Sequence, residues 1–242
     1  MTITYQSPGG ISVFFPAFND EKTIGILVSQ ALSLLPSLTD NYEVVVINDG
    51  SADATQHVLE ELALRSQHLK LVNHERNLGY GMALRSGFSH ATKELIFYTD
   101  GDGQYDVREI PNLLRLMTGD RQVVTGYKIK RSDARHRRIV GAVYNQLARL
   151  LFNLPVKDVD CDFRLIKRSA IKSIDLTSSG GTICVELIYK LRRNGCAFAE
   201  TPVNHYPRLH GQSQFFTLRR VSQTVRELAV LWLRLVAFRR AS

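Results

Sequence analysis

The chain of 242 residues has no apolar run that approaches the length of about 20 residues needed to span a bilayer. Its first residues, MTITYQSPGG, do not combine a basic stretch with an apolar one, so we expect no signal peptide. Cysteine is also scarce: Cys161, Cys184 and Cys196 are an odd number without CxxC spacing. We interpret them as reduced intracellular thiols, which excludes a disulfide framework and a cysteine-based metal site.

Negative charge is scarce in the second half of the chain. Residues 1–120 contain 8 Lys and Arg against 15 Asp and Glu, a net charge of −7, whereas residues 121–242 contain 23 against 8, a net charge of +15. A basic half indicates an anionic partner such as phosphate groups, a lipid headgroup surface or nucleic acid. An acidic half facing it suits a metal site, and charge alone does not choose among these partners.

Apolar, β-branched runs alternate with helical patterns, which indicates βαβ units and a parallel sheet. We predict one α/β domain over residues 1–242, with a Rossmann-like, mostly parallel sheet flanked by helices and a C-terminal amphipathic helix. The best internal boundary lies near residue 125. The predicted strands are 11–15, 42–48, 69–73, 94–100, 122–126, 163–167 and 197–203, and the predicted helices are 20–35, 52–65, 79–91, 107–117, 139–154, 182–194 and 217–239.

The strongest chemical signal is Asp100-Gly101-Asp102-Gly103-Gln104, at the end of an apolar strand. Mg²⁺ is typically held by one or two carboxylates together with substrate phosphates. Such a metal acts as a Lewis acid that neutralises charge on a departing diphosphate. The alternative is a hydrophilic turn, because Asp-Gly pairs are common turn formers.

Two more acidic turns follow predicted strands, and ligands of parallel sheets bind beyond these carboxyl ends. One is Ile47-Asn48-Asp49-Gly50-Ser51-Ala52-Asp53, and the other is Pro16-Ala17-Phe18-Asn19-Asp20-Glu21. A carboxylate in the first turn can accept a hydrogen bond from a base imide or a ribose hydroxyl. The alternative is helix capping, for which Ser51 or Asp53 is suited.

The succession FFPAFNDE, VVVINDGSAD, NLGYGMALRSGF, YTDGDGQYD, DVDCDFRLIKR and HYPRLHGQSQF resembles the family-2 glycosyltransferases. More narrowly, it resembles the dolichyl- or polyprenyl-phosphate sugar synthases, over residues 11 to about 230. The resemblance implies a GT-A fold, a nucleotide-sugar donor, Mg²⁺ or Mn²⁺, and inversion at the anomeric carbon. It also implies a nucleotide-sugar-binding half over about 1–125 and an acceptor-binding half over about 126–242.

Carried over position by position, the resemblance implies that Asp49 reads the nucleotide base and that Asp100, Asp102 and Gln104 lie at the metal and the diphosphate. Asn48 departs from the commoner aspartate at its place. Gly79 and Gly81 would let the backbone approach the donor, although loop-to-helix geometry also explains them. The full set of implied donor-binding residues is Pro16, Ala17, Glu21, Asp49, Gly79, Gly81, Asp100, Arg208, His210 and Ser213.

The chemical class of the acceptor can be inferred from the absence of an expected general base. Transfer to a hydroxyl needs a general base, and relatives that act on hydroxyls usually have an adjacent Glu-Asp pair where this chain has Glu186-Leu187. A phosphate acceptor is already anionic and needs only cations to hold it in line. The candidate acceptor-phosphate residues are Lys128, Arg131, Arg137 and Arg138, in a basic loop that also includes Lys130 and Arg135. The alternative for this loop is a solvated run of charge.

Three residues remain as candidate catalytic residues: Asp102, Arg164 and Glu186. Glu186 is either structural, pairing with an arginine such as Arg164, or a weak base or sugar-hydroxyl ligand, and we favour a supporting role. The resemblance places Asp160 and Asp162 near the donor sugar, with Asp162 where relatives often have glycine. Relatives often have a Ser-Arg pair where this chain has Gly141 and Ala142. The sequence therefore leaves open which arginine binds the acceptor phosphate.

We therefore predict an inverting, metal-dependent transfer from a UDP- or GDP-sugar to a polyprenyl or dolichyl phosphate. Two basic amphipathic helices, 139–154 and 217–239, indicate peripheral binding at the cytoplasmic face of a membrane, with core packing as the alternative.

The runner-up function is transfer to a saccharide hydroxyl with Glu186 or an aspartate of 158–162 as base. A nucleotidyltransferase would need a Gly-rich basic loop after the first strand. An anion- or nucleic-acid-binding module leaves the acidic turns unexplained, so we expect no nucleic-acid partner, and the oligomeric state stays open.

Overall fold

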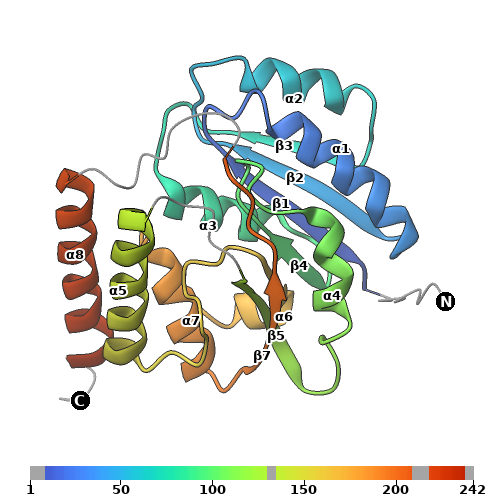
Figure 1. Ribbon diagram of the computed structural model, residues 1–242. Helices are drawn as coiled ribbons and strands as arrows, with labels where there is room; N and C mark the ends of the chain where they lie inside the picture. The colour runs from blue at the N-terminus through green and yellow to red at the C-terminus, as the bar shows by residue number, and fades with distance from the viewer. Residues whose placement is uncertain (1–8, 130–134, 209–217, 238–242) are drawn as a thin grey trace.

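Seven apolar runs form one sheet in the order β3-β2-β1-β4-β6-β5-β7 (Figure 1). The structure is a computed structural model that describes residues 9–129, 135–208 and 218–237. The central strands β1 and β4 are buried along their whole length, as expected when helices cover both faces of a sheet. The strands are β1 (Ile11–Ala17), β2 (Tyr42–Asn48), β3 (Leu69–Asn73), β4 (Leu95–Tyr98), β5 (Arg121–Lys128), β6 (Arg164–Lys167) and β7 (Ala197–Val203).

The direction of β6 determines which loops meet at the ligand edge of the sheet. β6 runs antiparallel to both β4 and β5, whereas the other neighbouring strands pair in parallel. The start of β6 therefore lies at the same edge as the carboxyl ends of β1, β2 and β4. Because Tyr98 is in register with Arg164, the residues just after β4 face those just before β6. The prediction of a mostly parallel sheet is confirmed.

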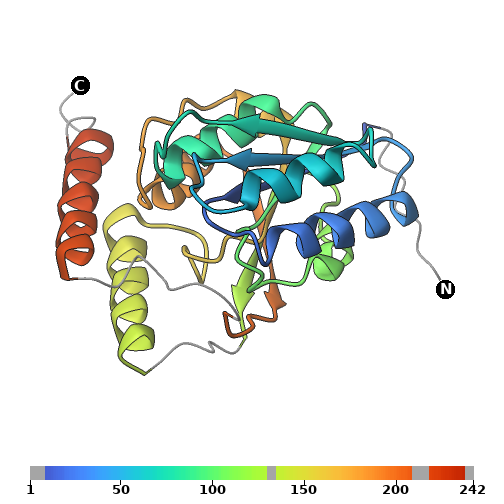
Figure 2. The same cartoon turned by 90° about the horizontal axis from the view of Figure 1, so that it is seen from above.

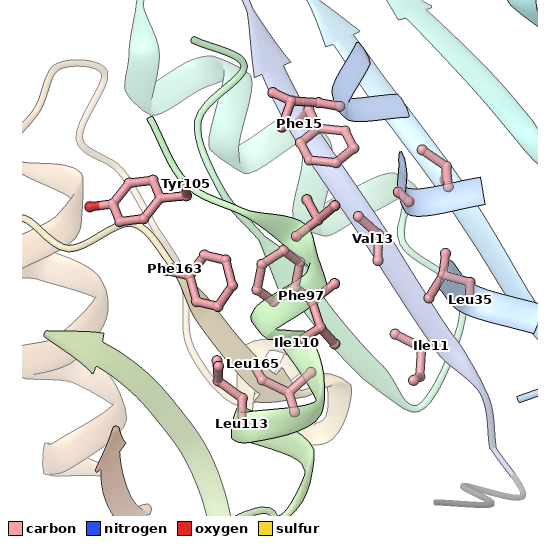
Figure 3. Close-up of a cluster of buried hydrophobic side chains, with 14 of the residues drawn as sticks. Ile11, Val13, Phe15, Leu35, Phe97, Tyr105, Ile110, Leu113, Phe163 and Leu165 are labelled. Atoms are coloured by element: carbon pink, nitrogen blue, oxygen red, sulfur yellow. The ribbon is translucent and has the colours of Figure 1, made fainter. Parts of the chain in front are cut away.

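Helices cover the two faces of the sheet. One apolar cluster packs β1 and β4 against α1 (Ile24–Leu34), α2 (Thr55–Ala63) and α4 (Ile110–Leu114), with the short 3-10 helices η1 (Leu35–Ser37) and η2 (Val107–Glu109). Figure 3 shows its centre, where Phe97 and Phe163 meet edge to face, with ring centroids 4.7 Å apart. A second cluster packs α3 (Tyr80–His90), α6 (Arg168–Lys172) and α7 (Ile183–Arg193) on the opposite face.

Two further helices stand side by side at one end of the molecule (Figures 1 and 2). They are α5 (Arg135–Phe152) and α8 (Leu218–Trp232), and α8 continues into a π-helical turn, η3 (Leu233–Ala237). A third apolar cluster joins them to α7 through Phe152, Ile188 and Leu228, and Trp232 Nε1 donates to the carbonyl of Leu151 (3.0 Å). Among the residues that the structure describes, none of the helices has the length and apolar character to cross a membrane.

The predicted elements are present, with differences at their ends. α5 begins at Arg135, inside the segment that we expected to be a basic loop. The short helix α6 was not predicted, because five residues are too few to show a helical period. β5 crosses the boundary predicted near residue 125, and strands of both predicted halves share one sheet. The division into a donor half and an acceptor half stays a prediction.

Candidate active site

The acidic turns after β1 and β2 lie against each other at the carboxyl edge of the sheet. The backbone N–H of Asp20 donates to the hydroxyl of Thr55 (2.9 Å). The Glu21 carboxylate accepts from the N–H of Ala54 (3.0 Å) at the start of α2. The side chain of Glu21, predicted to bind the donor, therefore holds these two turns together.

The end of β1 also anchors the turns on either side of it. The carbonyl of Ala17 accepts from the N–H of Asp49 (2.9 Å), and that of Pro16 accepts from the N–H of Gly101 (3.2 Å). Gly101 is needed for this approach, since a Cβ there would lie 2.8 Å from the Pro16 oxygen. The three strand ends predicted to form one site are thus brought together.

Asp100 and Asp102 are both largely withdrawn from solvent in the turn after β4. The hydroxyl of Tyr80 donates to Asp100 Oδ1 (2.7 Å). Burial raises the pKa of Asp100 well above its usual range, and the nearby charges of Asp162 and Asp102 raise it further. Burial also raises the pKa of Asp20 to about 6, with Asp102 adding to the effect and the Phe18 N–H opposing it. Several carboxyl groups therefore lie close together, with Lys128 and Arg208 as nearby cations that partly offset their charge.

The chemistry of these groups fits a hard divalent cation, although the site is not preformed. Within the described residues, no group of three or more His, Cys, Asp or Glu side chains is arranged to hold a metal ion. Asp100 and Asp102 offer only oxygen ligands, as Mg²⁺ and Mn²⁺ prefer. A bound cation would neutralise the two carboxylates and so reduce the free-energy cost of their repulsion and of their burial. Two carboxylates leave the remaining coordination positions to phosphate oxygens and water.

The segment after β7 closes over the acidic turn. Arg208 forms an ion pair with the Asp102 carboxylate. The side-chain amide of Gln104 donates to the carbonyl of Tyr206 (3.1 Å), and the N–H of Tyr206 donates to the carbonyl of Gln104 (2.9 Å). Gln104, predicted as a metal ligand, thus fastens this segment to the turn. The predicted donor ligands His210 and Ser213 lie outside the described residues.

The glycines before α3 are required by the protein's own chain. Gly79 has a φ of 94°, which an L side chain rarely adopts. A Cβ on Gly81 would lie 2.4 Å from the carbonyl oxygen of Ser178, and the Gly81 N–H donates to the carbonyl of Ser179 (2.8 Å). Close packing on residues 178–179 therefore explains these glycines, and their approach to a donor stays a prediction.

The Asp49 carboxylate accepts hydrogen bonds from the backbone of the same glycine turn. The Asp49 side chain is 5% exposed. Its Oδ1 accepts from the N–H of Leu78 (2.9 Å) and lies 2.6 Å from His74 Nδ1. Its Oδ2 accepts from the N–H of Gly79 (2.9 Å). The structure thus shows Asp49 positioning the turn, whereas reading of a nucleotide base stays a prediction.

Glu186 is fully buried and surrounded by donors, and these contacts favour a supporting role over that of a base. Its carboxylate accepts from the N–H groups of Thr177 and Ser178 and from Lys190 Nζ (2.7 Å). Arg234 Nη2 lies 3.4 Å away, so an arginine does pair with Glu186, although it is Arg234 rather than the example Arg164. Burial alone would raise the pKa of Glu186, but the hydrogen bonds from Lys190, Ser178 and Thr177 prevail and lower it to about 2. The supporting role that we favoured agrees with these contacts.

Arg164, a candidate catalytic residue, is likewise fully buried, and a direct contact with substrate stays a prediction. Its guanidinium donates to Asp162 Oδ1 (2.8 Å) and to the hydroxyl of Tyr98. Cys184 Sγ also donates to Asp162 Oδ1 (3.1 Å). Arg164 therefore holds Asp162 at the start of β6, opposite the turn that contains Asp100.

Of the predicted acceptor-phosphate residues, the structure describes the side chains of Lys128 and Arg138. Lys128 Nζ donates to the carbonyl of Asp160 (2.7 Å) and lies 3.9 Å from Asp158 Oδ2. Arg138 is exposed on α5. Arg131 and the side chain of Arg137 lie outside the described residues. Lys128 is therefore held on the acidic turn before β6, where its ammonium offsets the carboxylates.

Three residues of the site were missed by sequence reasoning. Tyr80 lies between the two glycines and donates a hydrogen bond to Asp100. Its place inside the glycine motif is a signal from which it could have been predicted. Asp20 precedes Glu21 in a turn that we had singled out, and it faces Asp102. Tyr98 is the last residue of β4 and binds the Arg164 guanidinium. Nothing in its apolar strand distinguishes it from a core residue.

Comparison with known proteins defines the class. The model of glycosyl transferase family 2 matches residues 12–175, more than half of the chain, and the chain belongs to this family. The predicted family and enzyme class, glycosyltransferase, are confirmed.

One curated relative within this family is similar to most of the chain. The chain is 27% identical over 213 residues to an undecaprenyl-phosphate 4-deoxy-4-formamido-L-arabinose transferase of Edwardsiella ictaluri, covering 88% of this chain and 65% of the relative. The chain thus spans just under two thirds of that relative's length. By its name, that relative is a polyprenyl-phosphate sugar transferase, the type that the motifs resemble.

Solved structures show the fold. Glucosyl-3-phosphoglycerate synthase of Mycobacterium tuberculosis, in complex with Mn²⁺, UDP and phosphoglyceric acid, superposes with a TM-score of 0.72 at 22% identity, covering 92% of this chain and 78% of that one. The same enzyme with Mg²⁺ and UDP gives 0.70 at 21% identity, covering 92% and 79%. The seven-stranded sheet with its flanking helices is therefore a GT-A fold, as predicted.

Proposed function

We propose that this glycosyltransferase moves a sugar from a nucleotide diphosphate to a polyprenyl phosphate, with inversion at the anomeric carbon. The observation that carries the proposal is the state of Glu186, which is buried, bound by several donors and low in pKa. A group in this state is a poor general base. An acceptor that is already a phosphate anion has no need of one, and the Edwardsiella relative's name points to the same kind of acceptor.

The donor would bind at the edge formed by the turns after β1, β2 and β4. Asp100 and Asp102 would hold Mg²⁺ or Mn²⁺, which supplies Lewis-acid neutralisation of the leaving diphosphate. Arg208, which now pairs with Asp102, is placed to exchange this carboxylate for donor phosphate oxygens, since guanidinium groups bind both. Tyr80 keeps Asp100 oriented. UDP and UDP-glucose in the solved relatives support a uridine donor.

An exposed apolar stripe supports peripheral attachment to a membrane. Ile139, Val143, Leu147 and Leu150 follow each other along α5 and are 65%, 63%, 41% and 70% exposed. A stripe of this kind on a helix with arginines is typical of interfacial binding. On α8, Leu228 and Leu231 pack in the third apolar cluster, in line with the core-packing alternative, whereas Val225 and Val230 are 52% and 56% exposed. We place the enzyme at the cytoplasmic face, where nucleotide sugars are made.

The test compares acceptors under one set of conditions. Purified protein, Mn²⁺ and a panel of UDP- and GDP-sugars are first screened for a rise in thermal midpoint, because a ligand of the folded state raises its apparent stability. The donor found is then incubated with farnesyl phosphate or with simple saccharides. We expect transfer to farnesyl phosphate. Transfer to saccharide hydroxyls alone would favour the runner-up, in which an aspartate of 158–162 acts as base.

A further inference from the structure

A chain of hydrogen bonds that involves His74 ends on Asp49, the residue predicted to read the nucleotide base. Asp49 follows β2, and His74 follows β3. His74 Nδ1 lies 2.6 Å from Asp49 Oδ1, and His74 Nε2 lies 2.9 Å from the hydroxyl of Ser86 on α3. The side chains of His74 and Asp49 are only 10% and 5% exposed. The chain therefore runs from α3 to Asp49 largely out of contact with solvent.

The direction of the bond between His74 and Asp49 follows from the chemistry of the two groups. A carboxylate only accepts hydrogen bonds, so His74 Nδ1 is the donor whether the imidazole is neutral or charged. The Ser86 hydroxyl holds the other side of the ring. The backbone N–H of His74 donates to the carbonyl of Asn48 (2.9 Å). His74 is thus a fixed donor to Asp49.

Most acceptor positions of the Asp49 carboxylate are occupied. The two oxygens of a carboxylate offer about four positions to donors. Oδ1 accepts from the N–H of Leu78 and from His74, which uses both of its positions. Oδ2 accepts from the N–H of Gly79. Among the residues that the structure describes, one position on Oδ2 is therefore left for a ligand.

Asn48, the last residue of β2, does not make up for the occupied positions. Its side-chain nitrogen donates to Asn73 Oδ1 (3.0 Å), and its own Oδ1 accepts from the N–H of Ser51 (3.1 Å). The residue is 2% exposed. Because both polar atoms of its amide are used within the fold, Asp49 is the better-placed acceptor for a base at the end of β2.

The two candidate bases differ in the donors that they present to a carboxylate. Uracil has one imide N–H, between two carbonyl groups. Guanine has two neighbouring donors, the ring N–H and the exocyclic amino group, which together pair with both oxygens of a free carboxylate. With Oδ1 of Asp49 already occupied, one guanine donor loses this partner, and an unpaired donor costs free energy in a buried site. A carboxylate with a single open position therefore matches uracil.

We propose that His74 is a specificity-determining residue, which occupies Asp49 Oδ1 and so selects a uridine over a guanosine donor. This inference rests on the proposed function, because it needs a nucleotide sugar bound at the edge of the sheet. His74 acts through Asp49 and is a positioning residue. If His74 only supported the fold, its replacement would weaken the binding of both nucleotides alike, so the ratio of the two affinities is the informative quantity.

Two amide substitutions separate the roles of the two ring nitrogens. Asparagine places its side-chain nitrogen near the position of Nδ1, whereas glutamine reaches the position of Nε2. We expect His74→Asn to keep the preference for UDP over GDP and His74→Gln to lower it about tenfold, the scale of one charge-assisted hydrogen bond. Calorimetric titration of the intact chain with UDP and with GDP, in the presence of Mn²⁺, measures the ratio, and thermal midpoints show whether each variant is folded.

The matched control is His57→Gln, because the His57 side chain is 74% exposed on α2. It should leave the ratio unchanged. Equal loss of UDP and GDP affinity in His74→Gln overturns the inference, and so does loss of the preference in a folded His74→Asn. The second comparison is decisive by itself if His74→Gln does not fold.

The unaltered chain separates this inference from the proposed function. Binding of UDP in preference to GDP is the expected result. Preference for GDP overturns the role of His74 while the proposed glycosyl transfer stands. If neither nucleotide binds with Mn²⁺, the proposed function itself fails, and the inference fails with it.

Discussion

At the residue scale, the site depends on side chains that position other parts of the chain. Glu186 holds Thr177 and Ser178, and this turn in turn packs on Gly81. Arg164 holds Asp162, and Asp49 holds the N–H groups of Leu78 and Gly79. Their charges are used within the fold, which leaves Asp100, Asp102 and Arg208 as the groups best placed for a donor.

Glu186→Gln distinguishes positioning from base catalysis. Its low pKa means that the ionised carboxylate stabilises the fold above its ordinary pKa of 4.5, and this stability is lost as the pH falls towards about 2. We expect the variant to lose about 2 kcal/mol of unfolding free energy at neutral pH and to lack that acid dependence. Denaturant unfolding at several pH values measures both.

The pH profile of kcat/KM completes this test. A positioning residue leaves the shape of the profile unchanged in Glu186→Gln, although the whole curve can fall. If the variant instead loses an acid limb that the unaltered enzyme shows, Glu186 is the general base and the phosphate-acceptor proposal loses its main support.

At the element scale, the strands and their mostly parallel pairing were predictable, and the antiparallel direction of β6 was not. β1 and β2 are continuous apolar, β-branched runs, and their acidic turns meet as parallel connections require. The reversal of β6 could not be predicted, because an apolar run has the same composition in either direction. That reversal brings Asp162 beside Asp100. The tertiary contacts that occupy Glu186 and Arg164 depend on residues far apart in sequence, which no local pattern shows.

The exposed stripe of α5 gives an element-scale prediction. We expect Val143→Asp with Leu150→Asp to weaken binding to anionic vesicles by more than about tenfold, since each buried aliphatic side chain is worth roughly 1.5–3 kcal/mol. Flotation or co-sedimentation measures this. Leu64→Asp is the matched control, because Leu64 is 90% exposed at the end of α2. Equal loss in the control, or no loss in the double variant, contradicts an interfacial role for α5.

At the scale of the whole molecule, charge is divided between the two halves of the sequence, −7 and +15. The basic half contains α5 and α8, which stand together at one end (Figure 2). We expect binding to anionic vesicles to fall steeply between low and high salt, because ions screen exposed charges. Neutral vesicles should show little salt dependence. Equal binding to both vesicle types at low salt would contradict this electrostatic contribution.

The most direct test is a crystal structure of the chain grown with Mn²⁺ and the sugar nucleotide that stabilises it. We predict anomalous density for manganese at Asp100 and Asp102, in contact with the diphosphate, with Arg208 released from Asp102. Manganese bound elsewhere while the sugar nucleotide occupies the sheet edge, or a nucleotide bound away from the turn 100–104, would contradict the account.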